Sequence, residues 1–269
     1  VDVDPVKRDL PIWTFPGDER IEADCAAVLE QVLHEVRSRS DDAFRARVAQ
    51  RVASWADANE KREKKIADAA ARPGERDALE PAWVLSQISA LIDPEDIVIN
   101  EAIRNGPLVQ DHVRRTQPLS YVGLSGGGLG FSGGMALGIK LAAPERRVIN
   151  IVGDGTFHFS TPDSVFATAQ QYGLPILTIV LDNRGWHAVK ASTLRVHPGG
   201  AAERDDAFQS RLDGNQQGST RRFEDIGAAF GAHAERVEDA EDLRDAVRRC
   251  LLAIDAGRAA VLTVRIAPL

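Results

Sequence analysis

Two apolar runs close together in the chain limit its fold more than any other feature. Residues 148–152 (VINIV) and 176–181 (ILTIVL) are short, continuous and rich in branched side chains, as is typical of strands buried on both faces of a sheet. The first run is followed by a glycine–aspartate–glycine turn with Asp154 at its centre, and the second by Asp182 and Asn183. Each predicted strand therefore ends on oxygen-bearing side chains.

The segment between the two runs predicts a helix. Thr161-Pro162-Asp163 is a typical helix start, because proline fits the first helical position. Strands that alternate with helices indicate an α/β fold with a doubly wound, mostly parallel sheet and helices on both faces. Residues 261–266 (VLTVRI) predict its last strand. The carboxyl ends of parallel strands meet at one edge, where open α/β sheets bind their ligands.

Asp154 and Asn183 predict a site for a hard divalent cation at that edge. Carboxylate and amide oxygens suit magnesium or calcium, and magnesium is usually held by few protein ligands, with water and phosphate completing its shell. Asp154, Asn183 and one backbone carbonyl satisfy this requirement. The sequence therefore predicts a magnesium site that also binds a phosphate-bearing ligand.

The spacing of these residues resembles a known signature. GDG, then 26 residues (156–181), then Asp182 and Asn183, is similar to the thiamin-diphosphate motif in which GDG is followed at this distance by two asparagines. The resemblance is to the pyrophosphate-binding domain of the acetolactate synthase and benzoylformate decarboxylase-like family, and it covers most of residues 80–269. Asp182 replaces the first asparagine. The metal ligand in the family is the second, here Asn183, so the resemblance retains the metal site.

The resemblance implies thiamin diphosphate and Mg²⁺ as cofactors, and it assigns the site residues. Asp154, Asn183 and Gly185 would be the metal ligands. Gly127 would offer its carbonyl to the aminopyrimidine, and Leu129 would be the apolar wedge that keeps the cofactor bent; ordinary core packing is the alternative for Leu129. The implied cofactor-binding residues are Arg104, Gly127, Gly128, Leu129, Gly153, Asp154, Gly155, Thr156, Asn183, Gly185 and Trp186.

Arg104 and His187 each have two interpretations. Arg104 lies in a loop that touches the cofactor diphosphate in the family, so it is either a bidentate phosphate ligand or a surface arginine. His187 lies in the substrate-side segment and is either a catalytic proton donor near neutral pH or a hydrogen-bonded loop residue. Val189 stands where yeast-type pyruvate decarboxylases carry a glutamate. This favours the synthase or benzoylformate-like branches.

Residues 128–133 (GLGFSG) also match the GxGxxG dinucleotide fingerprint, and Asp154 follows at roughly the spacing of a ribose-binding acid. An NAD-dependent dehydrogenase is therefore an alternative function. Against it, the strand signal before the glycines is weak, and a ribose-binding acid needs no second flanking glycine. The dehydrogenase interpretation also leaves Asn183 unexplained.

The N-terminal part predicts a different organisation. Residues 1–36 resemble the tail of the family's middle domain, residues 37–79 predict a charged helical linker, and residues 80–269 are expected to form the pyrophosphate-binding domain.

No candidate is found for the glutamate that activates the cofactor's pyrimidine in the family. The resemblance therefore implies a partner subunit carrying a pyrimidine-binding domain, in a heteromer such as a dimer of heterodimers; a split gene and a shortened chain are the two explanations. A non-catalytic subunit that keeps the fold is a third functional alternative.

Composition restricts the remaining function classes. The net charge of −7 argues against a nucleic-acid partner, and no apolar run reaches the roughly 20 residues that span a bilayer. Cys25 and Cys250 are far apart in the chain and fit reduced thiols of a cytoplasmic protein. The family resemblance implies a small 2-oxo acid as the substrate. The long polar segment 196–222 predicts a mobile cover over the site.

Overall fold

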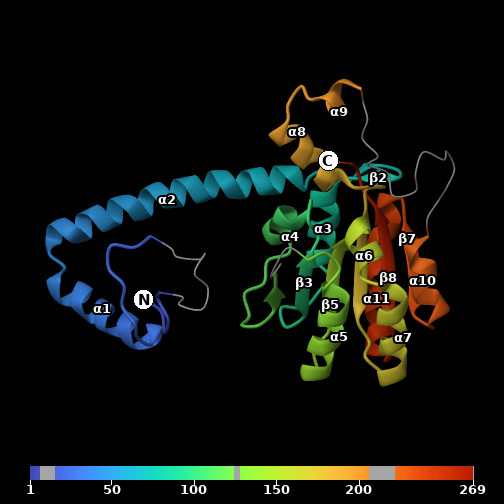
Figure 1. The fold of residues 1–269 in the computed structure, drawn as a ribbon, viewed down its shortest axis with the longest axis horizontal. Helices are drawn as coiled ribbons and strands as arrows, with labels where there is room; N and C mark the ends of the chain where they lie inside the picture. The colour runs from blue at the N-terminus through green and yellow to red at the C-terminus, as the bar shows by residue number, and fades with distance from the viewer. Residues whose placement is uncertain (7–15, 124–127, 206–221, 269) are drawn as a thin grey trace. The chain divides into compact units, whose positions relative to one another are not determined.

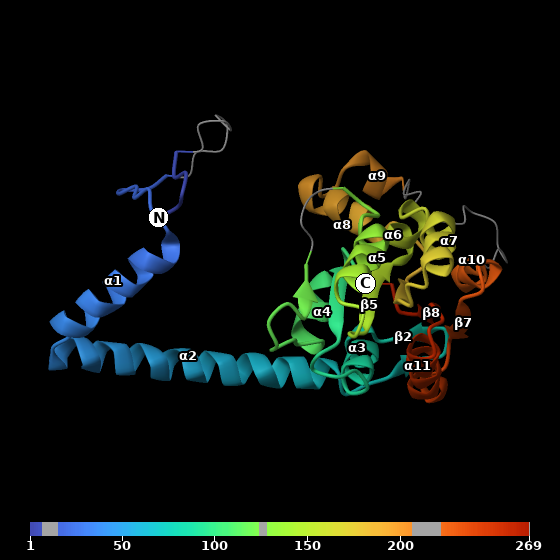
Figure 2. The ribbon, with the colours of Figure 1, turned by 90° about the horizontal axis from the view of Figure 1, so that it is seen from below.

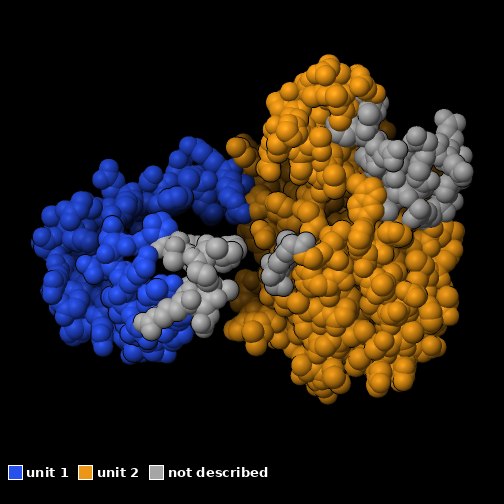
Figure 3. All heavy atoms as spheres, viewed as in Figure 1, with its two compact units in different colours: residues 1–63 blue, residues 64–269 orange. Residues whose placement is uncertain are grey.

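The structure is a computed structural model that describes residues 1–6, 16–123, 128–205 and 222–268 (Figure 1). The chain divides into two compact units, residues 1–63 and 64–269 (Figure 3). The first unit contains helix α1 (Cys25–Arg39) and most of helix α2 (Asp42–Ala69). Asp24 begins α1 by accepting a hydrogen bond from the Ala27 N–H group at 3.0 Å.

The helices of the first unit bury little. No residue of α1 or α2 is buried, and the apolar side chains of Val52 and Trp55 in α2 are exposed. Within the first unit, Asp2 and Glu22 form one isolated parallel bridge. Such helices gain little from packing within their own unit, and packing is the main source of helix stability in proteins.

The second unit is built on a six-stranded parallel sheet with the strand order β4-β3-β5-β6-β8-β7. This confirms the predicted doubly wound parallel fold. A two-stranded antiparallel sheet, β1 (Gly74–Glu75) with β2 (Ala78–Leu79), was not predicted. The strands of the main sheet are β3 (Ile97–Glu101), β4 (Tyr121–Val122), β5 (Val148–Gly153), β6 (Leu177–Asp182), β7 (His233–Val237) and β8 (Ala260–Arg265).

Helices cover both faces of this sheet (Figure 2). One face packs against α3 (Pro81–Ser89), α4 (Gly106–His112) and α11 (Ala240–Asp255), and the other against α5 (Ser132–Ala142), α7 (Pro162–Tyr172) and α10 (Phe223–Ala229). Three further helices follow strands or loops: α6 (Asp154–Phe159), α8 (His187–Val196) and α9 (Ala201–Arg204). Cys250 lies in the core, and neither Cys25 nor Cys250 forms a disulfide.

The register brings the ends of three neighbouring strands to one edge. Glu101 pairs with Val152, and Gly153 pairs with Leu181. Because all pairings are parallel, the residues just beyond these pairs emerge on the same side of the sheet. This is the edge at which α/β sheets bind ligands. Among the described residues, no helix is both long and apolar enough to cross a bilayer.

Candidate active site

Asp154 follows β5 directly and is the first residue of α6. Its side chain is 3% exposed, and its Oδ1 atom accepts a hydrogen bond from the Gly155 N–H group at 2.9 Å. Its Oδ2 atom has no hydrogen-bond partner among the described residues. A buried carboxylate oxygen without a donor is costly, because desolvation is not compensated. A divalent cation bound at this oxygen would remove that cost.

Burial, together with the neighbouring Asp182 carboxylate, raises the pKa of Asp154 to about 7. The unfolded chain has the ordinary aspartate pKa of about 3.9. Between roughly pH 4 and 7 the folded state therefore holds a proton that the unfolded state has lost. The raised pKa therefore contributes to the free energy of unfolding in full below about pH 4. This contribution is lost as the pH rises through the folded-state pKa.

A pH series of unfolding tests this linkage. Without metal, we expect the free energy of unfolding of the wild type to fall between pH 5 and 7, relative to Asp154→Asn, by on the order of 1 kcal/mol per pH unit. The measurement is urea denaturation in chelated buffer at several pH values. Parallel curves for the two proteins would show that Asp154 does not titrate in this range.

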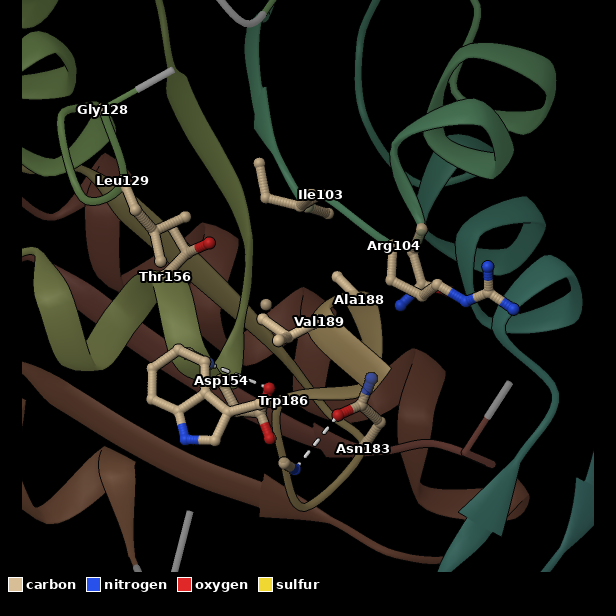
Figure 4. Close-up of a pocket in the computed structure, with 15 residues that line it drawn as sticks. Ile103, Arg104, Gly128, Leu129, Asp154, Thr156, Asn183, Trp186, Ala188 and Val189 are labelled. Atoms are coloured by element: carbon tan, nitrogen blue, oxygen red, sulfur yellow. Dashed lines mark hydrogen bonds between the residues drawn. The ribbon is translucent and has the colours of Figure 1, made fainter. Parts of the chain in front are cut away.

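Asn183 follows the last residue of β6, the strand that pairs with β5 in the sheet. It is buried, and its Oδ1 atom accepts a hydrogen bond from the Gly185 N–H group at 3.2 Å. Figure 4 shows the Asn183 oxygen on the side of the residue that faces Asp154. Residue 184 turns the chain here with a positive φ of 70°. The strand ends thus bring both predicted metal ligands to one cavity.

Asp182 stands where the family usually has asparagine, and both of its carboxylate oxygens accept hydrogen bonds. Its Oδ2 atom accepts a hydrogen bond from Arg265 Nη1 at 2.6 Å, and its Oδ1 atom accepts one from the Arg184 N–H group at 2.9 Å. Arg265 comes from β8, the next strand of the sheet. The buried carboxylate is thus balanced by a cation from β8, which explains how an aspartate is accommodated at this position.

The strand ends and loops enclose a cavity of about 380 Å³ (Figure 4). Except for Gly127, every residue predicted to bind the cofactor lines it; Gly127 lies outside the described residues. Five lining residues were absent from the predicted set, namely Ala102, Ile103, Asn105, Ala188 and Val189. Asn105 is buried, and its Oδ1 atom has no hydrogen-bond partner in the described part of the chain. The cavity therefore combines apolar walls with uncompensated buried oxygens.

The second glycine of the GDG turn has a packing reason. A Cβ atom added at Gly155 would lie 2.6 Å from Cζ3 of the Trp186 ring. Trp186 in turn stacks edge-on against Phe159, with ring centroids 5.5 Å apart. Because the indole lies directly over Gly155, the turn after β5 and the loop after β6 are packed together. A larger residue at 155 would displace the indole or the turn.

The two side chains with alternative interpretations are placed as follows. Arg104 is exposed, and in Figure 4 its guanidinium extends away from Asp154 and Asn183. His187 is half-buried, and its Nε2 atom lies 3.1 Å from the Asn183 carbonyl oxygen. Burial lowers the pKa of His187. His187 is not among the residues lining the cavity, a position that favours the loop-residue interpretation. The catalytic role of His187 and the phosphate-binding role of Arg104 stay predictions.

Sequence reasoning missed Glu101, the last residue of β3. Its carboxylate accepts hydrogen bonds from the N–H groups of Gly130, at 2.6 Å, and Ser132, at 2.8 Å. The signal was present in the sequence, because Glu101 follows an apolar strand just as Asp154 does. Its carboxylate occupies the N–H groups that a dinucleotide pyrophosphate would need at the start of α5. This contact counts against the dehydrogenase interpretation.

Gly130 is a position where only glycine fits. Its φ is +94°, and an added Cβ atom would lie 2.6 Å from the Phe159 carbonyl carbon. We expect Gly130→Ala to lower the free energy of unfolding by about 2–5 kcal/mol, since left-handed backbone costs about 1–2 kcal/mol and overpacking about 1–3.

Gly134 in α5 is the matched control, because nothing lies within 4 Å of an added Cβ atom there. Gly134→Ala should instead stabilise the protein by about 0.5–1 kcal/mol, the usual gain of alanine over glycine in a helix. Urea denaturation measures both changes. Equal effects of the two substitutions would contradict the tight contact at Gly130.

The segment predicted as a mobile cover is partly described. Residue 196 ends α8, and residues 201–204 form α9. Residues 206–221 lie outside the described part of the chain. The function of the segment as a cover stays a prediction.

Comparison with known proteins adds independent evidence. The sequence pattern of the family described as "Thiamine pyrophosphate enzyme, C-terminal TPP binding domain" matches residues 106–264, more than half of the chain. A benzoylformate decarboxylase of Pseudomonas aeruginosa is 29% identical over 175 residues, which are 65% of this chain and 30% of the relative. A probable acetolactate synthase large subunit of Methanococcus aeolicus is 24% identical over 184 residues, 64% of this chain and 28% of the relative.

A solved structure agrees with the fold. The Rhodococcus jostii RHA1 thiamine diphosphate-dependent 4-hydroxybenzoylformate decarboxylase superposes with a TM-score of 0.60 at 23% identity, covering 73% of this chain and 34% of that one. The chain thus spans about a third, or less, of the length of the proteins it matches. The match over residues 106–264 includes both strand ends of the site. The chain belongs to the thiamine pyrophosphate enzymes, the family of the benzoylformate decarboxylases and acetolactate synthases, and carries their C-terminal TPP binding domain.

Proposed function

We propose that this chain is the cofactor-diphosphate half of a thiamin-diphosphate- and Mg²⁺-dependent 2-oxo acid decarboxylase or carboligase. The observation that carries the proposal is the pair of oxygen ligands, Asp154 and Asn183, on adjacent strand ends at one cavity. The Oδ2 atom of Asp154 is buried without a hydrogen-bond partner among the described residues, as expected of an oxygen that binds a cation.

The chain's own residues would hold the cofactor by its diphosphate. Asp154, Asn183 and the Gly185 carbonyl would hold Mg²⁺, which would supply positive charge for a bound diphosphate. Leu129 and Val189 form apolar walls beside these ligands. When bound, the thiazolium ring supplies the electron sink for loss of carbon dioxide from a 2-oxo acid, while the protein supplies binding, orientation and electrostatics.

We further propose that activity requires a partner subunit carrying the pyrimidine-binding domain, in a heteromer such as a dimer of heterodimers. One observation supports this. The described residues that line the cavity include no glutamate that could activate the pyrimidine. A small 2-oxo acid would then bind where the two chains meet.

Calorimetric titration of the purified chain tests the proposal. Thiamin diphosphate should bind only when Mg²⁺ is present, and thiamin without the diphosphate should not bind measurably. NAD, titrated under the same conditions, tests the dehydrogenase alternative. Equally tight binding of thiamin diphosphate in the presence of a chelator would contradict metal-dependent binding. Binding of NAD but not of thiamin diphosphate would support the dehydrogenase alternative instead.

A further inference from the structure

Glu101 is a buried acid that is held by backbone groups. Glu101 is 1% exposed. Its carboxylate accepts hydrogen bonds from the N–H groups of Gly130, just before α5, and Ser132, the first residue of α5. No ion pair of Glu101 is found within the described residues. Hydrogen bonds from N–H groups to an ionised carboxylate are among the stronger ones, and the positive end of a helix favours a carboxylate. Glu101 therefore fixes this backbone segment firmly to β3.

The segment that Glu101 holds carries one wall of the cavity. Gly128 and Leu129 line the cavity and directly precede Gly130. On its other side, Gly130 is packed against backbone, since an added Cβ atom would lie 2.6 Å from the Phe159 carbonyl group and 2.8 Å from Ser160 N. The backbone next to Leu129 is thus clamped between the Glu101 carboxylate and the end of α6. Both contacts restrict the backbone that directly follows Leu129.

The main chain of Glu101 makes a separate contact. The Glu101 carbonyl oxygen accepts a hydrogen bond from Thr156 Oγ1 at 3.0 Å, two residues beyond Asp154. A substitution of the Glu101 side chain leaves this bond in place. The two contacts can therefore be separated by experiment, because one holds the Leu129 segment and the other the turn that carries Asp154.

We propose that Glu101 is a positioning residue that sets Leu129 against the ring-bearing part of thiamin diphosphate, without affecting the diphosphate end. This inference rests on the proposed function for the identity of the ligand. Glu101→Gln retains the shape of the side chain but places an amide N–H₂ group opposite one of the two backbone N–H donors. One hydrogen bond is lost, and the segment that carries Leu129 is released.

Titrations with two ligands test the proposal in the presence of Mg²⁺. For Glu101→Gln we expect the affinity for thiamin diphosphate to fall by about tenfold, which corresponds to the loss of one charge-assisted hydrogen bond, with unchanged affinity for inorganic pyrophosphate. Glu224→Gln is the matched control, because Glu224 is also 1% exposed, pairs with Arg236 at 2.8 Å and does not line the cavity. It should change neither affinity. An equal fall for both ligands, or no fall, would overturn the proposal.

Amide hydrogen exchange of the ligand-free chain gives a readout that does not depend on the cofactor. Exchange at Gly130 and Ser132 should accelerate in Glu101→Gln but not in Glu224→Gln, and unchanged protection in Glu101→Gln would refute the clamp. If the wild type binds neither ligand, the proposed function is wrong. The exchange measurement still tests whether the Glu101 carboxylate holds the N–H groups of Gly130 and Ser132. If Glu101→Gln does not fold, Leu129→Ala should show the same selective loss of thiamin diphosphate affinity. Full affinity in Leu129→Ala would equally overturn the inference.

Discussion

Replacing Asp154 by asparagine is expected to abolish the Mg²⁺-dependent binding of thiamin diphosphate. Asparagine has the same shape but removes the only negative charge among the three proposed metal ligands. The affinity should fall by more than the roughly 10–100-fold that is typical when an outer-shell partner of a metal site is replaced. Calorimetric titration with and without Mg²⁺ measures the change. Retained metal-dependent affinity would remove Asp154 from the metal site.

Two features of the structure make this result easy to interpret. The Asp154 carboxylate is buried with one oxygen unpartnered among the described residues, so its replacement by a neutral amide should not destabilise the metal-free fold at neutral pH. Asp182→Asn is the matched control, since Asp182 is 2% exposed, lies at the next strand end and pairs with Arg265. It should retain metal-dependent binding, because asparagine is the residue that the family usually carries there.

The second large effect concerns turnover. The chain alone, saturated with thiamin diphosphate and Mg²⁺, is expected to consume no 2-oxo acid above background. Co-expression with an adjacent gene product that carries a pyrimidine-binding domain should give a complex with turnover that is higher by orders of magnitude, because the activating glutamate would come from that chain. Carbon dioxide release from pyruvate and from benzoylformate is the measurement, and gel filtration reports the complex.

The controls separate three outcomes. The same complex built with Asp154→Asn should form but remain inactive, which would tie turnover to the metal ligand. Turnover by the lone chain would refute the requirement for a partner. A complex that binds the cofactor but consumes no 2-oxo acid would instead support a subunit that keeps the fold without catalysis.

The sequence predicted the sheet edge because its determinants are local. Residues 148–152 and 176–181 are mostly apolar, with one polar residue each, and polar residues follow them, which identifies buried parallel strands and their carboxyl ends without any tertiary information. The structure confirms both strands as neighbours in the sheet, with Gly153 paired to Leu181. The short helix α6 was missed, because glycine residues on both sides of Asp154 indicate a turn more strongly than a helix.

What the sequence by itself determined was the fold class and the residues at the two strand ends, since hydrophobic pattern and turn chemistry act over short distances along the chain. Tertiary structure alone decided the partners of the buried charges. Glu101 meets the N–H groups of residues some 29 to 31 positions later, and Asp182 meets Arg265 across 83 positions. Such contacts depend on how strands and loops pack in space, and no local pattern specifies which donor will reach a given carboxylate.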